Sequence, residues 1–117
     1  MNRPRLRVGR IAALNMYPLY HHLERTARDD FAFTDGVPTT LNRALVAGRI
    51  DVSAMSSIEF ARHQDTLRLL PVASITASGA VDSIQVFSRA PLEELRTIAV
   101  TPHSATSVAL LRILVGP

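Results

Sequence analysis

Short apolar segments alternate with segments of helical periodicity along the first half of the chain. The apolar run over residues 5–13 predicts a strand. Pro18 opens the segment over 18–27, in which leucines recur at helical spacing, and a proline in the first turn is typical of a helix. The alternation then continues along the chain: strands are expected over 31–34 and 50–55, and helices over 41–47 and from 57 to about 63.

Two signals set the ends of the helix over 41–47. Thr39 or Thr40 can cap its beginning, because a threonine hydroxyl accepts a hydrogen bond from a free backbone N–H of the first turn. Gly48 is expected to end it as the C-terminal cap, a place where glycine adopts a left-handed conformation without strain.

The second half of the chain continues the alternation. Strands are expected over 67–75, 83–88 and 97–100, with a small-residue loop over 76–82 and a short helical turn over 91–96. Ser104 or Thr106 opens a last helix, whose apolar residues are Val108, Leu111, Leu114 and Val115. This order predicts an α/β fold with a mostly parallel sheet. The loop over 76–82 is the best candidate for a crossover, so residues 1–82 are expected to form a first lobe and residues 83–117 the crossover strand and the beginning of a second lobe.

Composition places the chain among folded globular proteins. It has 117 residues, 47% of them hydrophobic, which is enough for one modest domain. There is no cysteine, which excludes a disulfide framework and any cysteine-based metal site or nucleophile. No apolar run reaches the length of a membrane span, and the N-terminal segment lacks the pattern of a secretory signal peptide. We therefore expect a cytoplasmic protein with no membrane partner.

The charge distribution does not favour a nucleic-acid partner. All 13 basic residues are arginine, and the net charge is +3. The one basic cluster consists of Arg3, Arg5, Arg7 and Arg10. Without interleaved aromatic residues it favours a solvated strand entry over a nucleic-acid arm. The four histidines show no zinc-type spacing, so no metal is expected, and no pattern indicates an oligomeric state.

Polar side chains gather where strands end and helices begin. Asn15 follows the first strand, and its amide can bind a ligand or cap the next helix. Ser56 and Ser57 follow the third strand, and with Glu59 they match a capping box, in which Glu59 reaches back to the backbone N–H of Ser56. The carboxyl ends of parallel strands meet at one edge of a sheet, so these positions predict a small-anion site.

Four hydroxyl residues lie in the turn Thr101-Pro102-His103-Ser104-Ala105-Thr106-Ser107. They are consistent both with a carboxylate or phosphate cradle and with a helix cap. The turn lacks the glycine-rich, lysine-ended pattern of a P-loop, so nucleotide binding is not indicated. Glu59 is the formal candidate for a general base, although capping explains its position, and no Ser-His-Asp arrangement follows from the order of the residues.

Three stretches cover almost the whole chain: VGRIAALNMYPLY, GVPTTLNRALVAGRIDVSAMSSIEFARH and SIQVFSRAPLEELRTIAVTPHSATSVALLRIL. Their most specific pieces are Leu-Asn-x-x-Pro-Leu, with Asn15 as its asparagine, and Ser-Ser-Ile-Glu-aromatic-Ala, which begins at Ser56. Together these stretches resemble the chorismate dehydratases of the futalosine route to menaquinone.

The resemblance implies a two-lobed fold like that of type II periplasmic binding proteins, with the substrate in the cleft. It implies conversion of chorismate to 3-[(1-carboxyvinyl)oxy]benzoate by loss of water, without a cofactor. At the matching positions, Asn15 is expected to be catalytic and to contact the reacting region of chorismate. The expected substrate-binding residues are Ser56, Ser57, Ser83, Ser104, Thr106 and Ser107. A carboxylate of the substrate can serve as the proton acceptor, because the chain offers no good candidate.

Members of that family are much longer than this chain and contain most of a second lobe. We therefore expect a truncated copy or a fragment, with its cleft open on one side and its activity in doubt. Two other functions stay open, a module that binds a small carboxylate without chemistry and an inactive remnant of the enzyme. Turnover separates enzyme from binder, because a pure binder has no turnover to lose.

Overall fold

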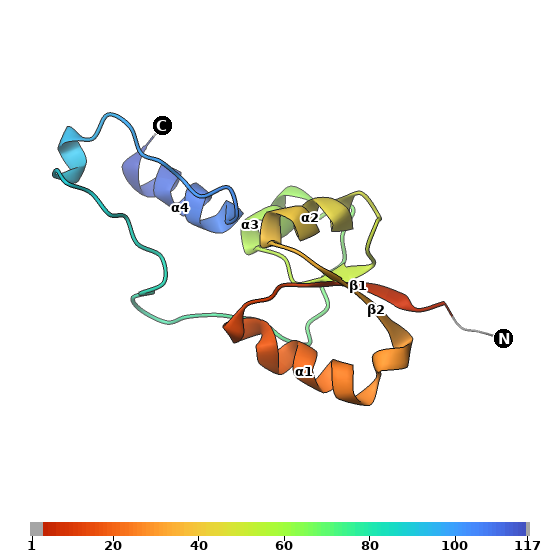
Figure 1. The fold of residues 1–117 in the computed structure, drawn as a ribbon. Coiled ribbons are helices and arrows are strands. Elements are labelled where there is room, and N and C mark those ends of the chain that lie inside the picture. The colour runs from red at the N-terminus through yellow and green to blue at the C-terminus, as the bar shows by residue number, and fades with distance from the viewer. Residues whose placement is uncertain (1–3, 117) are drawn as a thin grey trace.

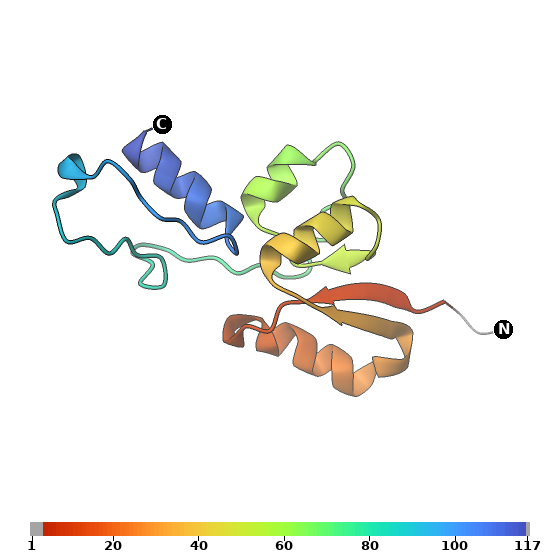
Figure 2. The same cartoon turned by 45° about the horizontal axis from the view of Figure 1, so that its top comes forward.

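A small parallel sheet with helices on both faces forms the centre of the computed structural model, which describes residues 4–116 (Figure 1). Its strands are β1 (Leu6–Arg10), β2 (Phe31–Asp35) and β3 (Val52–Ser53), in the order β2-β1-β3. Helix α1 covers one face, and α2 and α3 lie on the other (Figures 1 and 2). Leu6 pairs with Phe31, and Val8 pairs with Val52. The expected α/β class and parallel sheet are confirmed.

The helices of this half lie close to where the pattern places them. They are η1 (Leu14–Met16), α1 (Tyr17–Thr26), η2 (Arg28–Asp30), α2 (Pro38–Val46) and α3 (Ser57–Arg62). Helix α2 begins at Pro38 without a side-chain cap, so the expected capping by Thr39 or Thr40 is wrong. A proline is suited to the first helical position, where its missing N–H leaves no bond unmade. Gly48 follows α2 with φ 67°, and its expected role as the C-terminal cap is confirmed.

Two small apolar clusters hold the sheet and its helices together. Val8, Met16 and Tyr20 pack between the sheet and α1. Leu41, Ala44 and Ile50 form the second cluster beneath α2. Gly9 is required between them, because a Cβ there would lie 2.6 Å from Ser53 Oγ and 2.8 Å from Ile50 Cδ1.

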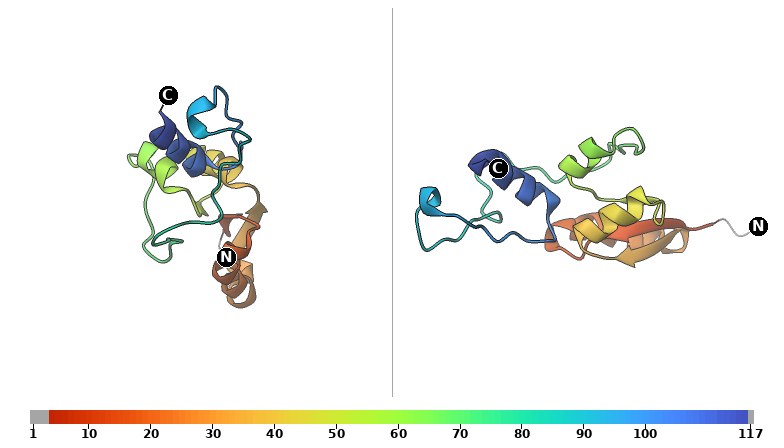
Figure 3. Two further views of the ribbon diagram at one scale, coloured as in Figure 1. Left: turned by 90° about the vertical axis from the view of Figure 1, so that its left-hand side faces the viewer. Right: turned by 90° about the horizontal axis from the view of Figure 1, so that it is seen from above.

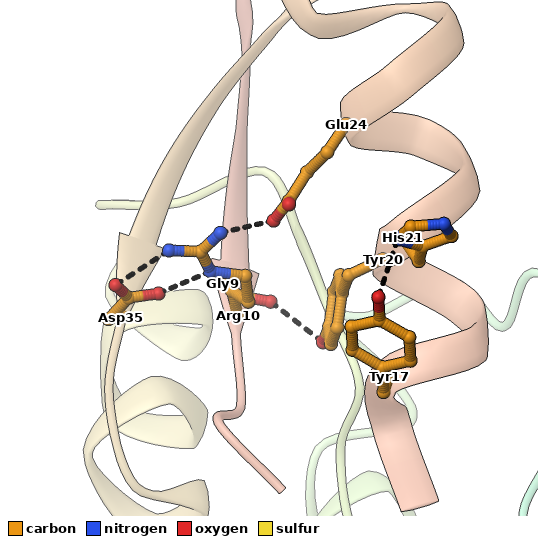
Figure 4. Close-up of polar contacts among 7 residues, drawn as sticks. All are labelled: Gly9, Arg10, Tyr17, Tyr20, His21, Glu24 and Asp35. Atoms are coloured by element: carbon orange, nitrogen blue, oxygen red, sulfur yellow. Dashed lines mark hydrogen bonds and ion pairs between the residues drawn. The ribbon is translucent and has the colours of Figure 1, made fainter. Parts of the chain in front are cut away.

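A polar network fixes α1 against the sheet (Figure 4). Arg10 pairs with Asp35 at 2.5 and 2.8 Å and with Glu24 of α1. The buried Tyr20 hydroxyl donates to the Gly9 carbonyl at 3.1 Å, and burial raises its pKa, so it stays a donor. The Tyr20 bond holds the first turn of α1 against β1, and the Glu24 pair holds its C-terminal part.

The described arginines of the basic N-terminal cluster all form ion pairs. Arg5 pairs with Asp29, Arg7 with Asp51, and Arg10 with Asp35 and Glu24. Arg3 lies outside the described residues. The charges of these three arginines are therefore balanced by carboxylates of the same chain. This agrees with the interpretation of the cluster as the solvated beginning of a strand.

The pair Arg7–Asp51 joins β1 to the segment that leads into β3. The Asp51 carboxylate accepts three bonds from Arg7: from the backbone N–H at 2.8 Å, from Nε at 3.0 Å and from Nη2 at 2.5 Å. These bonds favour the ionised carboxylate and lower its pKa from 3.8 to about 2. The folded state therefore binds this proton more weakly than the unfolded state does.

We expect the Asp51→Asn variant to be less stable than the unsubstituted chain at neutral pH. Because its pKa is lower in the folded state, ionised Asp51 contributes fully to the free energy of unfolding above about pH 4. This contribution is lost as the pH falls towards 2. The difference in urea midpoint between the two proteins should therefore shrink over that window. Asp65→Asn is the matched control, because Asp65 forms no ion pair within residues 4–116. A difference that persists unchanged at pH 2 would contradict this assignment.

The expected strands over 67–75, 83–88 and 97–100 are absent from the described residues. Their apolar side chains are exposed instead: Leu69 by 69%, Val72 by 80% and Phe87 by 88%. An apolar segment forms a strand only where a neighbouring strand can pair with its backbone N–H and C=O groups. None of the three segments pairs with the sheet. The helical turn expected over 91–96 is confirmed as η3 (Leu92–Glu94), and the last helix as α4 (Ala105–Val115).

The second half extends away from the sheet, with α4 beside α3 (Figure 3). The molecule measures 64 × 28 × 22 Å and has a radius of gyration of 17.1 Å, against about 13 Å for a compact domain of this length. Its accessible surface is 9650 Å², against roughly 6300 Å² for a compact protein of this mass. No helix between residues 4 and 116 is long and apolar enough to cross a membrane.

Candidate functional site

A cavity of about 400 Å³ lies where α4 packs beside α3. Both views of the ribbon show the start of α4 next to α2 and α3 (Figures 1 and 2). The cavity is lined by Thr39, Ile58, Arg62, Thr101, Pro102, Ser104, Ala105, Val108, Ala109, Arg112 and Ile113.

The lining combines cationic and hydroxyl groups with an apolar wall. Two arginines, Arg62 and Arg112, line the cavity together with the hydroxyl residues Thr39, Thr101 and Ser104. Arg62 also donates to Glu59 at 2.6 Å, whereas Arg112 forms no ion pair in the part of the chain that the structure describes. Such a lining can hold a small anion with an apolar ring, because arginine binds carboxylates through two parallel hydrogen bonds.

The start of α4 satisfies much of its own hydrogen bonding. Ser104 is the N-cap: its Oγ accepts from the Ser107 backbone N–H at 3.3 Å and lies 2.7 Å from Ser107 Oγ. Thr101 Oγ1 accepts from the backbone N–H of His103 at 3.2 Å. The cap expected at Ser104 is confirmed, and the same residue lines the cavity.

The capping box expected at the start of α3 does not form. Ser56 is the N-cap residue, but its side chain makes no capping bond, and its buried Oγ has no partner. Glu59 does not reach back to Ser56 and pairs with Arg62 one turn later. The i,i+3 spacing places the two charges on the same face of α3, where the ion pair competes with the cap. Ser57 is the first residue of α3 and is exposed.

Asn15 lies in η1 at the carboxyl end of β1, where the sequence places it, and its side chain is exposed. It does not cap α1: the N-cap residue is Met16, and no side chain caps that helix. The capping alternative is therefore wrong, and the amide is free to meet a ligand. Asn15 does not line the cavity between α3 and α4.

Of the seven residues expected at the site, the structure places one, Ser104, in the cavity wall. Thr106 and Ser107 lie in the first turn of α4 without lining it, and Ser83 lies exposed in a turn. The arginines of the wall, Arg62 and Arg112, were not anticipated. Both lie in the last turns of their helices, where a cation suits the helix dipole, so nothing in the sequence marked them as ligands.

The chain matches the menaquinone biosynthesis family over residues 6–117. A chorismate dehydratase of Thermus thermophilus is 41% identical over 100 residues, which are 86% of this chain and 36% of that protein. A chorismate dehydratase of Campylobacter jejuni subsp. jejuni is 34% identical over 112 residues, which are 91% of this chain and 46% of that protein. The chain thus spans less than half the length of these curated relatives.

Proposed function

Because this chain belongs to the menaquinone biosynthesis family, we propose that it carries part of a chorismate dehydratase. The observation that carries the proposal is the 41% identity to the Thermus thermophilus chorismate dehydratase over 86% of the chain. In this reaction a ring proton and the ring hydroxyl leave chorismate as water. The ring becomes aromatic, and the product is 3-[(1-carboxyvinyl)oxy]benzoate.

The cavity between α3 and α4 supports a substrate of this kind. Chorismate has two carboxylates, and two arginines, Arg62 and Arg112, are among the residues that line the cavity. Its six-membered ring suits the apolar side of the wall, formed by Ile58, Val108 and Ile113. Aromatisation favours the reaction, so the protein has to orient the substrate more than supply a strong base.

Within this proposal Asn15, which lies outside the cavity between α3 and α4 in this chain and has no capping role, contacts the reacting region of chorismate in the complete enzyme. The substrate-binding residues remain those expected from the sequence: Ser56, Ser57, Ser83, Ser104, Thr106 and Ser107. A carboxylate of the substrate takes the ring proton, as expected from the sequence, and Glu59, the formal alternative, is paired with Arg62. The reaction needs no cofactor and takes place in the cytoplasm.

We further propose that residues 1–82 and 83–117 belong to two lobes of a periplasmic-binding-protein-like fold, with the cleft between them. The large accessible surface and the exposed apolar side chains of residues 67–100 fit segments that pack against further parts of such a fold.

A second candidate function is a module that binds a small carboxylate without chemistry. The observation that favours it is the same lining, which offers hydrogen-bond donors and cations but no carboxylate or imidazole to move a proton. A site of this kind binds an anion without any catalytic step.

Turnover of chorismate tests the two functions. The aromatic product is followed by chromatography and ultraviolet absorbance with two proteins: this chain, and this chain joined to the part of the Thermus thermophilus relative that the match does not cover. Product from either protein supports the dehydratase. If neither protein gives product and both bind chorismate in calorimetry, the binding module is the function, and the proposed chemistry is wrong.

A further inference from the structure

The two arginines that line the cavity between α3 and α4 differ in their partners. Arg62 donates to Glu59 at 2.6 Å, one turn earlier on the same helix. Arg112 forms no ion pair within residues 4–116. The side chain of Glu59 is 19% exposed and that of Arg62 is 55% exposed. The cavity wall therefore contains one positive charge that is balanced by a largely enclosed carboxylate and one that is not balanced.

Glu59 contacts Arg62 from outside this cavity. It does not line the cavity of about 400 Å³, but it does line a neighbouring one of about 190 Å³ between α2, α3 and the start of α4. Arg43 of α2 also lines the smaller cavity, yet the described residues contain no ion pair between Arg43 and Glu59. Glu59 thus acts on the larger cavity through its pair with Arg62.

This pair changes what Arg62 can offer a ligand. One bond, from Nη1 to Glu59 Oε1, leaves the guanidinium with further N–H donors. Its positive charge is balanced, however, and the carboxylate of Glu59 repels a carboxylate of a ligand that approaches Arg62. Arg112 has no such neighbour in the part of the chain that the structure describes, so it attracts an anion with its full charge.

We propose that Glu59 determines how this cavity binds a dicarboxylate: Arg112 anchors one carboxylate, and Glu59 withholds the charge of Arg62 from the other. Glu59 is a positioning residue in this arrangement, because it acts through Arg62 and does not touch the ligand. The second carboxylate of the ligand is left without a cationic partner.

This inference rests on the proposed function where it assigns a role to that free carboxylate. A carboxylate beside an arginine is a weaker base, so the carboxylate without an arginine is the better acceptor for the ring proton of chorismate. As it takes the proton, the electron pair of the C–H bond forms the new double bond of the ring, and the bond to the ring hydroxyl breaks. The departing hydroxide takes up the proton and leaves as water.

Calorimetric titration of this chain with benzoate and with isophthalate tests the binding. Benzoate has one carboxylate and isophthalate has two on the same ring, so we expect affinities within about twofold of each other when a single arginine is available. Glu59→Gln keeps the shape of the side chain and releases the charge of Arg62. It should raise the affinity for isophthalate about tenfold, as one added charge-assisted contact does, and that for benzoate no more than about threefold. A loss of structure cannot produce such a gain.

Glu93→Gln is the matched control, because Glu93 is an exposed glutamate of η3 (Leu92–Glu94) without an ion pair within residues 4–116. It removes the same charge and should leave both affinities unchanged. An unchanged ratio of the two affinities in Glu59→Gln overturns the proposal.

The two arginines are compared in the same titrations. Arg112→Gln should weaken the binding of both acids at least about tenfold, whereas Arg62→Gln should change each affinity less than about twofold. Equal losses in these two variants overturn the proposal, as does a lack of saturable binding of both acids to the unsubstituted chain. These affinities need no turnover, so they are decided separately from the proposed function.

The role in proton transfer is tested in the joined protein described above. There Glu59→Gln should lower KM for chorismate, because both carboxylates are then held, and should also lower kcat, because the proton acceptor is paired with Arg62. A kcat that does not fall overturns this role of Glu59. A joined protein without any turnover overturns the proposed function instead, and the affinities for benzoate and isophthalate still decide how Glu59 acts on binding.

Discussion

Replacing Leu41 by alanine is expected to lower the free energy of unfolding by about 2–5 kcal/mol. Leu41 is the most buried large side chain of the described residues, with 1% of its surface exposed. It packs with Ala44 and Ile50, and Gly36 lies against it so closely that a Cβ there would come within 3.1 Å of the leucine. Truncation leaves a cavity that these neighbours cannot fill. Domains of this size have a total stability of about 5–15 kcal/mol, so the loss is a large part of it.

Leu69→Ala is the matched control for this measurement. The same side chain is removed, but from a residue that is 69% exposed, so the expected change is within about 0.5 kcal/mol. Urea unfolding followed by circular dichroism compares the two variants. A loss at Leu69 as large as that at Leu41 would show that residues 67–75 are packed as a buried strand and would contradict the structure.

The contrast between Leu41 and Leu69 also shows how far the sequence predicts the fold. Around Leu41, helical spacing, a C-terminal glycine and a following strand are local features that agree with one another. The structure confirms the helix and its glycine, and the strand expected over 50–55 forms over Val52–Ser53. Leu69 lies in a run that is equally apolar. Its expected strand depends on a distant pairing partner, which periodicity does not report.

At the candidate site too, local features could be predicted from the sequence and long-range ones could not. The N-cap at Ser104 was predicted correctly because a helix cap is a local pattern of residue type and spacing. Arg62 and Arg112 could not be, because they share a cavity only after α4 packs beside α3.

Asn15→Ala is expected to lower kcat for chorismate by about 10²–10³-fold, the typical effect of losing a hydrogen-bond donor that serves the transition state. The structure supports this role in two ways. Asn15 lies at the carboxyl end of β1, where α/β folds hold small ligands, and its amide neither caps α1 nor is buried. An exposed amide without a structural bond contributes little to stability, so the substitution should leave the thermal midpoint unchanged.

The measurement uses whichever form of the protein turns over chorismate, with kcat and KM determined separately. If the amide acts only in the transition state, kcat falls and KM changes little. Asn15→Asp, which keeps the shape but replaces the donor by a negative charge, should lose at least as much activity beside a dianionic substrate. Thr26→Ala, at the far end of α1, is the control and should keep full activity. A higher KM with unchanged kcat would place Asn15 in binding alone, and unchanged values of both would remove it from the site.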